Sequence, residues 1–277
     1  MTAAAVDWHA RAAALRVDGR MVIDGDRRSA QSGETFTCAS PIDGRPLGEV
    51  ARGRAADIDA AVQSARRAFD DGRWTHTAPA ARKRILQRFA ERILAAREEL
   101  ALLETLDMGK PIQYALSVDV PATARCIQWY GEAIDKVYDE IAPTPRSALA
   151  LITREPMGVI GAIVPWNYPM IMAAWKLGPA LAAGNSVVLK PSEKSPLTAL
   201  RLAELAVIES DGAVQVLRLD EGRITRAVQA GASAEELIEF LRQVSSVPLV
   251  DAVTRLVSDS AARADRVSLL AATTVVV

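Results

Sequence analysis

The sequence predicts an α/β protein that contains the first, incomplete part of a doubly wound, Rossmann-like parallel sheet. From residue 157 to 206 the chain alternates two apolar strand candidates with two helical patterns, and this β-α-β-α order is typical of such sheets. Helical patterns fill residues 58–138, and short strand candidates fill residues 21–50. After residue 206 the pattern changes to a small, mostly helical module. We therefore predict two regions, residues 1–206 and 207–277.

Composition and charge exclude several classes of protein. Half of the 277 residues are hydrophobic and the formal net charge is −1, so no bulk field recruits nucleic acid or an anionic membrane. The sequence has no apolar run long enough to cross a bilayer and no secretory signal, which favours a cytoplasmic location. Its two cysteines, Cys38 and Cys126, are expected to be free thiols. His9 and His76 lie in no ligand motif, so no metal site is predicted.

The N-terminal residues predict a short helix and a small antiparallel element. Residues 4–15 are rich in alanine and favour the helix. Short β-favouring segments alternate with turn-forming pairs, which predicts antiparallel strands. The strand candidates are Met21–Ile23, Thr35–Cys38 and Leu47–Val50, and the turns are Gly25-Asp26, Ser32-Gly33 and Asp43-Gly44.

Apolar residues at helical spacing predict the next elements. One stripe runs from Ile58 to Phe69, with Asp57 as its predicted N-cap. Two further helices contain the apolar sets Ile85, Phe89 and Ile93, then Leu100 and Leu103, and their charged faces are expected to be solvated. Another helix is predicted at 119–138, with Trp129 and Tyr130 packed, and prolines 143 and 145 end it.

The central stretch supplies the predicted parallel sheet. A strand candidate at 148–153 precedes Met157–Val164, whose apolar run suits the interior of a parallel sheet. Prolines 165 and 169 bar a helix between them, so PWNYP is a loop. A helix is predicted from Met170 to Ala183 with Gly184 as its C′ residue, then a strand from Ser186 to Lys190. Ser195 is the predicted cap and Pro196 the first residue of a helix to Ala206.

Two loops follow these strands, at the edge where such sheets bind ligands. Lys190 and Glu193, in KPSE, suit ribose hydroxyls, and a carboxylate there would repel a 2′-phosphate, which favours NAD over NADP. Asn167, in PWN, offers an amide N–H₂ to an oxyanion. The alternative is that Asn167 only holds a turn and that residues 190–193 only cap a helix. The residues alone leave both interpretations open.

Three long motifs carry a family resemblance: LLETLDMGKPI (102–112), REPMGVIGAIVPWNYP (154–169) and WKLGPALAAGNSVVLKPSEKSPL (175–197). Through them, residues 18–206 resemble the NAD-dependent aldehyde dehydrogenases, closest to those that act on ω-amino or γ-glutamylamino aldehydes.

The resemblance implies roles for individual residues. It makes Asn167 part of an oxyanion hole and places Lys176 near the substrate. Tyr168, Met172 and Trp175 would line the substrate tunnel, although Met172 and Trp175 could also be plain helix core. The implied coenzyme-binding residues are Ile163, Pro165, Trp166, Asn167, Lys190, Ser192 and Glu193.

Other parts of the family pattern do not occur in this sequence. The family reaction needs a cysteine thiolate and a glutamate base, in GQxC-type and LELGG-type motifs after KPSE, and neither motif is present. No cysteine follows Cys126, which we interpret as a core thiol. The F-T-G-S-type loop that meets the coenzyme pyrophosphate is also missing. We therefore expect this chain to be inactive alone and to bind NAD weakly or in part.

The C-terminal module is predicted to hold one strand and three helices. The strand is expected at 213–219 and the helices at 221–229, 233–244 and 248–263, with apolar faces at Leu237, Phe240, Leu241 and Val244, and at Val253, Leu256 and Val257. Residues 208–267 resemble part of the helicase-associated domain of actinobacterial relatives of XPB-type DNA helicases. Helicase activity is not implied, because no Walker motif is present, and acids offset the arginines, so nucleic acid is not an expected partner.

Three hypotheses follow from these observations. The chain is an aldehyde dehydrogenase acting on a small-molecule aldehyde, or a weak nucleotide-binding or interaction protein, or a truncated fusion joined near residues 206–209. A sheet with an uncovered edge favours self-association, so a homo-oligomer is expected.

Overall fold

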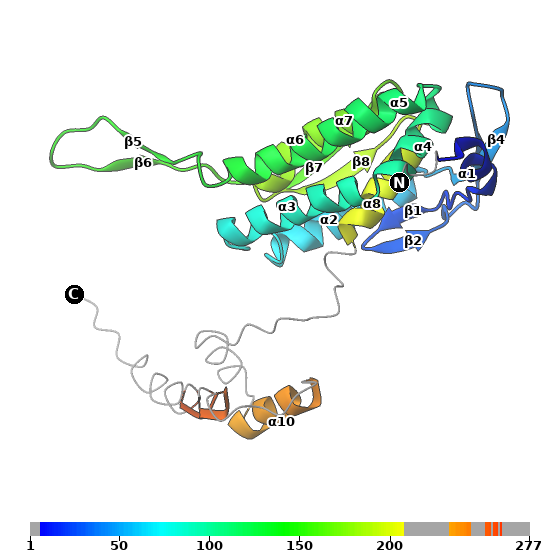
Figure 1. Cartoon of the computed structure of the whole chain (residues 1–277). Coiled ribbons are helices and arrows are strands. Elements are labelled where there is room, and N and C mark those ends of the chain that lie inside the picture. The colour runs from blue at the N-terminus through cyan, green and yellow to red at the C-terminus, as the bar shows by residue number, and fades with distance from the viewer. Residues whose placement is uncertain (1–5, 208–232, 245–252, 256, 260, 262–277) are drawn as a thin grey trace, which may run out of the picture. The chain divides into compact units, whose positions relative to one another are not determined.

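The computed structural model describes residues 6–207, 233–244, 253–255, 257–259 and 261 (Figure 1). The chain divides into two compact units, Met1–Gly212 and Ala213–Val277, and each is described by itself. None of the described helices combines the length and the apolar character that a membrane span requires. The first unit mixes helices with four two-stranded sheets, which confirms the α/β class.

The N-terminal element is a short helix followed by two β-hairpins. Helix α1 (Trp8–Ala14) begins after Asp7, whose carboxylate accepts a hydrogen bond from the Ala10 N–H at 3.0 Å. Antiparallel pairing joins the strands β1 (Met21–Ile23) with β2 (Asp26–Arg28), and β3 (Thr35–Ala39) with β4 (Pro46–Ala51). The three predicted strands are confirmed. The predicted turn at Gly25-Asp26 is wrong by one residue, because Asp26 already pairs with Ile23.

Helix α2 (Ala55–Asp70) begins at a different cap from the one predicted. Arg54, not Asp57, is the N-cap, and Asp57 is the third helical residue. From that position its carboxylate reaches back to accept hydrogen bonds from the N–H groups of Arg54 and Gln31, each at 2.9 Å. Asp57 therefore ties the start of the helix to the turn between β2 and β3.

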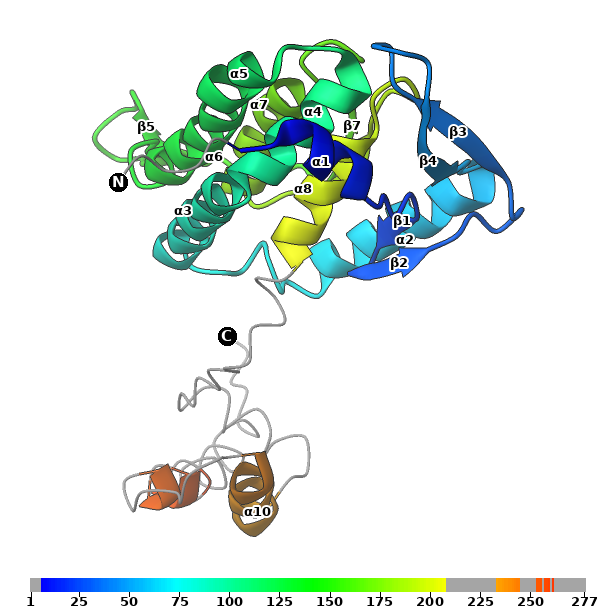
Figure 2. The ribbon, with the colours of Figure 1, turned by 45° about the vertical axis from the view of Figure 1, so that its right-hand side comes forward.

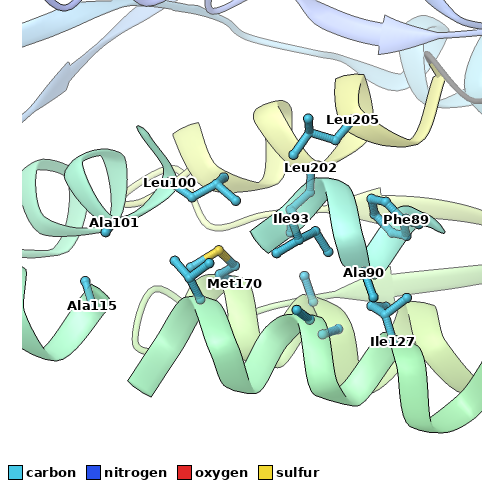
Figure 3. Packing of buried hydrophobic residues seen from close by; sticks show 14 of the residues in the cluster. Phe89, Ala90, Ile93, Leu100, Ala101, Ala115, Ile127, Met170, Leu202 and Leu205 are labelled. Carbon is cyan, nitrogen blue, oxygen red and sulfur yellow. The ribbon is translucent and has the colours of Figure 1, made fainter. Parts of the chain in front are cut away.

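The main core lies among the helices (Figure 3). Helix α3 (Pro79–Ala95) packs on α6 (Val120–Ala133), and α6 packs on α7 (Pro169–Ala182). The helices α4 (Arg97–Met108) and α8 (Leu197–Val207) contribute to the same cluster. The fully buried members include Leu86, Ile93, Leu100, Ile127, Met170 and Leu202.

The segment between α4 and α6 is more irregular than predicted. Gly109 ends α4 in the left-handed conformation (φ 81°), and α5 (Ile112–Tyr114) leads into a π-helical turn, Ala115–Asp119. The helix predicted at 119–138 ends at Ala133. Trp129 was predicted to pack but is 59% exposed. Tyr130 does pack, against Gly178: a Cβ atom on that glycine would lie 2.5 Å from the Tyr130 ring.

A β-hairpin leaves the helical body after α6. Its strands β5 (Glu140–Ala142) and β6 (Ala150–Ile152) pair antiparallel, and the strand predicted at 148–153 is β6. The hairpin extends from one end of the first unit, and β1–β4 gather at the other (Figures 1 and 2). Ile141 and Leu151 are 69% and 62% exposed on it.

The sheet that positions the candidate site consists of two parallel strands. β7 (Val159–Ile163) pairs with β8 (Ser186–Lys190), and α7 connects them. Gly184 has φ 91° and its N–H bonds the Leu181 carbonyl at 3.0 Å, which confirms the predicted helix end. The predicted burial of the first strand is wrong, because Ile163 is 74% exposed. Among the described residues no third strand lies beside β7 and β8, so each has an unpaired edge that a strand in the interior of a sheet does not have.

Helix α8 follows the KPSE loop with a cap that the sequence did not predict. Ser195 does not cap it: the Ser195 hydroxyl donates to the Trp166 carbonyl at 3.0 Å. The first helical N–H, of Leu197, donates instead to the Asp107 carboxylate at 2.8 Å. A carboxylate from α4, ninety residues earlier in the chain, therefore fixes the start of α8.

In the second unit the described residues that follow Ser233 are helical. Helix α10 (Ala234–Val244) confirms the helix predicted at 233–244 and begins with a capping box between Ser233 and Glu236. Leu241 and Val257 are buried together, with Leu237 and Val253 against them. The side chains of Phe240 and Val244, the whole of Leu256, and the segments 213–219 and 221–229 lie outside the described residues.

Candidate functional site

The parallel register of β7 and β8 brings the two predicted loops together. Ile163 lies opposite Lys190 at the carboxyl ends of the strands, and the Val164 N–H bonds the Lys190 carbonyl at 3.1 Å. The PWN and KPSE loops therefore leave the sheet side by side. The hydrogen bond from Ser195 to the Trp166 carbonyl links them a second time.

The KPSE loop presents an ion pair to solvent. The Lys190 ammonium lies 3.1 Å from a carboxylate oxygen of Glu193, and the two side chains are 52% and 68% exposed. Hydrogen bonding to the backbone N–H of Glu193 and then to Lys190 lowers the pKa of the Glu193 carboxyl, which keeps it ionised. The Ser192 hydroxyl accepts from the Lys194 N–H at 3.2 Å. The loop thus offers one cation, one anion and a hydroxyl at the end of β8.

The PWN loop is also exposed. Pro165, Trp166 and Asn167 all lie at the surface, and Trp166 is 52% exposed. The Asn167 side chain makes no hydrogen bond within the part of the chain that the structure describes. Its amide is therefore available to a ligand, whereas the interpretation as a turn-holding side chain finds no hydrogen bond there to support it.

The four residues predicted near the substrate lie at the N-cap of α7 and within that helix. Tyr168 is its N-cap, in the left-handed conformation with φ 52° and ψ 47°, and is 39% exposed. Met172 is half-buried against the main core, which partly matches the plain-core interpretation. Trp175 is 58% exposed and Lys176 is exposed, so neither is core.

A buried charged cluster lies behind this surface and was not predicted. Lys110 is 7% exposed, and its ammonium lies 2.5 Å from the Asp119 carboxylate and 3.7 Å from that of Glu104. The same ammonium lies 4.0 Å from the Tyr168 ring centroid. Glu104 and Asp107 are also buried, at 0% and 1% exposed. The available signal was the pair of acids three residues apart within the apolar run of LLETLDM.

Burial perturbs the acids of this cluster strongly. Desolvation, opposed in part by Lys110, raises the pKa of Glu104 to about 8. Desolvation also raises the pKa of Asp107 to about 7, although hydrogen bonds from Cys38 and the Leu197 N–H oppose it. At neutral pH, Glu104 is therefore mostly protonated.

Neither cysteine has the environment of a nucleophile. Cys38 is 2% exposed and its thiol donates to Asp107 at 3.0 Å. Burial, followed by the Asp107 charge, raises the pKa of Cys38 far above its ordinary value, and burial raises the pKa of Cys126 as well. Both thiols stay protonated at neutral pH, so neither supplies the thiolate that attack on an aldehyde requires.

Comparisons with known proteins match most of the chain. The model of the aldehyde dehydrogenase family matches residues 28–244, past residue 206, where we expected the resemblance to end. The NADP/NAD-dependent aldehyde dehydrogenase PuuC of Escherichia coli (strain K12) is 54% identical over 199 residues, 72% of this chain and 40% of that protein. Aminoacetaldehyde dehydrogenase of Pseudomonas aeruginosa is 50% identical over 200 residues, with the same coverages of 72% and 40%.

Solved structures of aldehyde dehydrogenases are similar to this chain over a comparable share of its length. An indole-3-acetaldehyde dehydrogenase in complex with NAD⁺ has a TM-score of 0.72 at 61% identity, over 73% of this chain and 41% of that one. The gamma-glutamyl-gamma-aminobutyraldehyde dehydrogenase of Burkholderia cenocepacia J2315 also gives 0.72, at 57% identity, over 75% and 42%. The chain thus spans about 40% of the length of the curated relatives that it matches. The helicase-associated resemblance of residues 208–267 stays a prediction.

Proposed function

The chain belongs to the aldehyde dehydrogenase family, and on that basis we propose that it carries the adenosine half of an NAD site together with an oxyanion donor. One observation carries the proposal: the exposed Lys190–Glu193 pair lies beside the PWN loop at the carboxyl end of β7 and β8. Ligands of parallel α/β sheets bind at this edge.

The groups at this edge fit an adenosine ribose. Glu193 is ionised and accepts hydrogen bonds from the ribose hydroxyls, while Lys190 donates to them. Ser192 adds a hydroxyl, and Ile163, Pro165 and Trp166 give an exposed apolar rim on the neighbouring strand end. Bound NAD supplies the hydride acceptor of the family reaction. The sequence contains no F-T-G-S-type loop for the pyrophosphate, so we propose that binding is weak and confined to the adenosine side.

Asn167 is the proposed oxyanion donor for a small-molecule aldehyde. Its amide is exposed and makes no hydrogen bond within the described ranges. Tyr168, Met172 and Trp175 follow it on α7 as the proposed substrate surface, with Lys176 next to Trp175. We also propose that the protein is cytoplasmic, that it forms a homo-oligomer, and that β7 and β8 belong to a doubly wound sheet.

Because both thiols are protonated, we propose that this chain does not itself oxidise aldehydes. It then acts as a weak nucleotide-binding or interaction protein, and the outer edges of β7 and β8, which pair with no further strand among the described residues, favour this second candidate function. A fusion joined near residues 206–209 is an alternative origin of the same molecule. We propose no nucleic-acid role for residues 207–277.

Replacing Glu193 by glutamine is expected to remove discrimination against NADP. In the unaltered chain the Glu193 charge repels a 2′-phosphate, and one such contact near the surface is worth about 1 kcal/mol, or roughly five-fold in Kd. Calorimetric titrations with NAD and NADP measure the ratio. Glu91→Gln, which neutralises an exposed acid on α3, is the matched control and keeps it. Equal binding of both coenzymes by the unaltered chain would contradict the role of Glu193.

A further inference from the structure

Tyr168 holds a backbone conformation that ordinary side chains avoid. Asp24 is the only other non-glycine residue with positive φ in the part of the chain described. The left-handed region crowds the Cβ atom against the following carbonyl, so the surroundings must hold Tyr168 there. Tyr168 directly follows Asn167, so its dihedral angles decide how the PWN loop joins α7.

A cation from a distant part of the chain lies over the Tyr168 ring. The Lys110 ammonium lies 4.0 Å from the Tyr168 ring centroid and 5.4 Å from that of Tyr114. Its side chain is only 6% exposed, and a cation that is shielded from water is attracted to a ring face more strongly than an exposed one.

Lys110 is itself fixed from the opposite side. Asp119 bonds its ammonium at 2.5 Å, and Glu104 lies 3.7 Å away. Both acids are 0% exposed. Gly109, in the left-handed conformation, and Pro111 set the backbone on either side. The ammonium is thus held between buried carboxyl groups and the ring that precedes α7, where it cannot move freely.

We propose that Lys110 is a positioning residue for the oxyanion donor: its buried ammonium holds the Tyr168 ring and thereby fixes the backbone that presents Asn167. The proposal rests on the function proposed above for Asn167. Lys110 reaches Tyr168 and does not itself face the exposed surface, so it acts through another residue.

The sequence offers a sharp test, because it contains only two asparagines, Asn167 and Asn185. Protein labelled with ¹⁵N-asparagine gives two backbone amide signals. The Asn185 N–H bonds the Ala180 carbonyl at 3.0 Å, and this buried residue reports whether the fold is intact. The spectra are recorded without nucleotide, so failure of the coenzyme proposal does not affect them.

Lys110→Met is expected to move the Asn167 signal and to leave the Asn185 signal in place. Lys83→Met is the matched control, because it breaks a Lys–Asp pair of 2.6 Å on the exposed side of α3, and it leaves both signals in place. Tyr168→Phe keeps the ring face and is expected to move the Asn167 signal far less than Lys110→Met does.

An unmoved Asn167 signal in Lys110→Met would overturn the proposal. If this variant does not fold, Lys110→Met combined with Asp119→Asn removes the orphaned charge and carries the same expectation. Loss of the Asn185 signal in that double variant as well would show that Lys110 serves the fold in general, and would also overturn it.

Discussion

Glu104→Gln is expected to stabilise the protein by about 3 kcal/mol more at pH 8 than at pH 5. Glu104 is 0% exposed, and burial raises its pKa from 4.5 to about 8. Unfolding releases the carboxyl group into water, where it ionises at its ordinary pKa. Glutamine keeps the shape and cannot ionise, so it removes this drive towards the unfolded state.

The direction of the pH dependence follows from proton binding. Between pH 4.5 and about 8 the folded state keeps the Glu104 proton that the unfolded state loses, so the free energy of unfolding falls as pH rises through this window. Below the lower value both states are protonated and the group has no effect. Asp107, with its pKa raised from 3.8 to about 7, adds a similar fall that Glu104→Gln does not remove.

Urea denaturation at the two pH values measures this difference. Glu91→Gln, on the exposed face of α3, is the matched control and is expected to change the free energy of unfolding by less than about 0.5 kcal/mol at either pH. An effect of Glu104→Gln that is the same at both pH values would contradict the protonated, buried carboxyl group.

The second large expected effect is the absence of turnover. With NAD and any aldehyde, the purified chain is expected to form NADH at least about 10⁴-fold more slowly than a family member that has the catalytic cysteine, the scale of losing a nucleophile. The physical reason is that Cys38 and Cys126 both have raised pKa values and Cys38 is buried. The near-ultraviolet absorbance of NADH measures the rate.

A control separates true turnover from contamination. Asn167→Ala removes the proposed oxyanion donor, and a rate due to this chain would fall with it. Steady NADH formation by the unaltered chain that Asn167→Ala abolishes would contradict the expectation, because it would require a working nucleophile.

The sequence predicted the central elements well, because local signals determine them. The order of β7, α7 and β8 follows from an apolar run, two prolines and Gly184, and no distant contact was needed. The neighbouring ends of the PWN and KPSE loops follow from parallel pairing alone.

The predictions were wrong where a side chain contacts residues that are distant in the sequence. Asp107 of α4 caps α8, whereas Ser195, the predicted cap, donates its hydroxyl to the Trp166 carbonyl. The Lys110 cluster joins acids of α4 and of the π-helical turn to the ring of Tyr168, and sequence spacing does not reveal such a meeting. The predicted burial of β7 was also wrong, because the exposure of Ile163 depends on neighbouring elements that no local pattern specifies.

The most direct test of the half-site compares AMP with NAD by calorimetry on the unaltered chain. If only the adenosine side is bound, the two ligands have similar affinities, with Kd values on the order of 1 mM, or about −4 kcal/mol. Lys190→Ala is expected to weaken both equally, because both would use the same ribose contacts. NAD binding that is a hundred-fold tighter than AMP binding, a difference of about 2.7 kcal/mol in binding free energy, would contradict a site confined to the adenosine side, since it would require contacts to the pyrophosphate and nicotinamide.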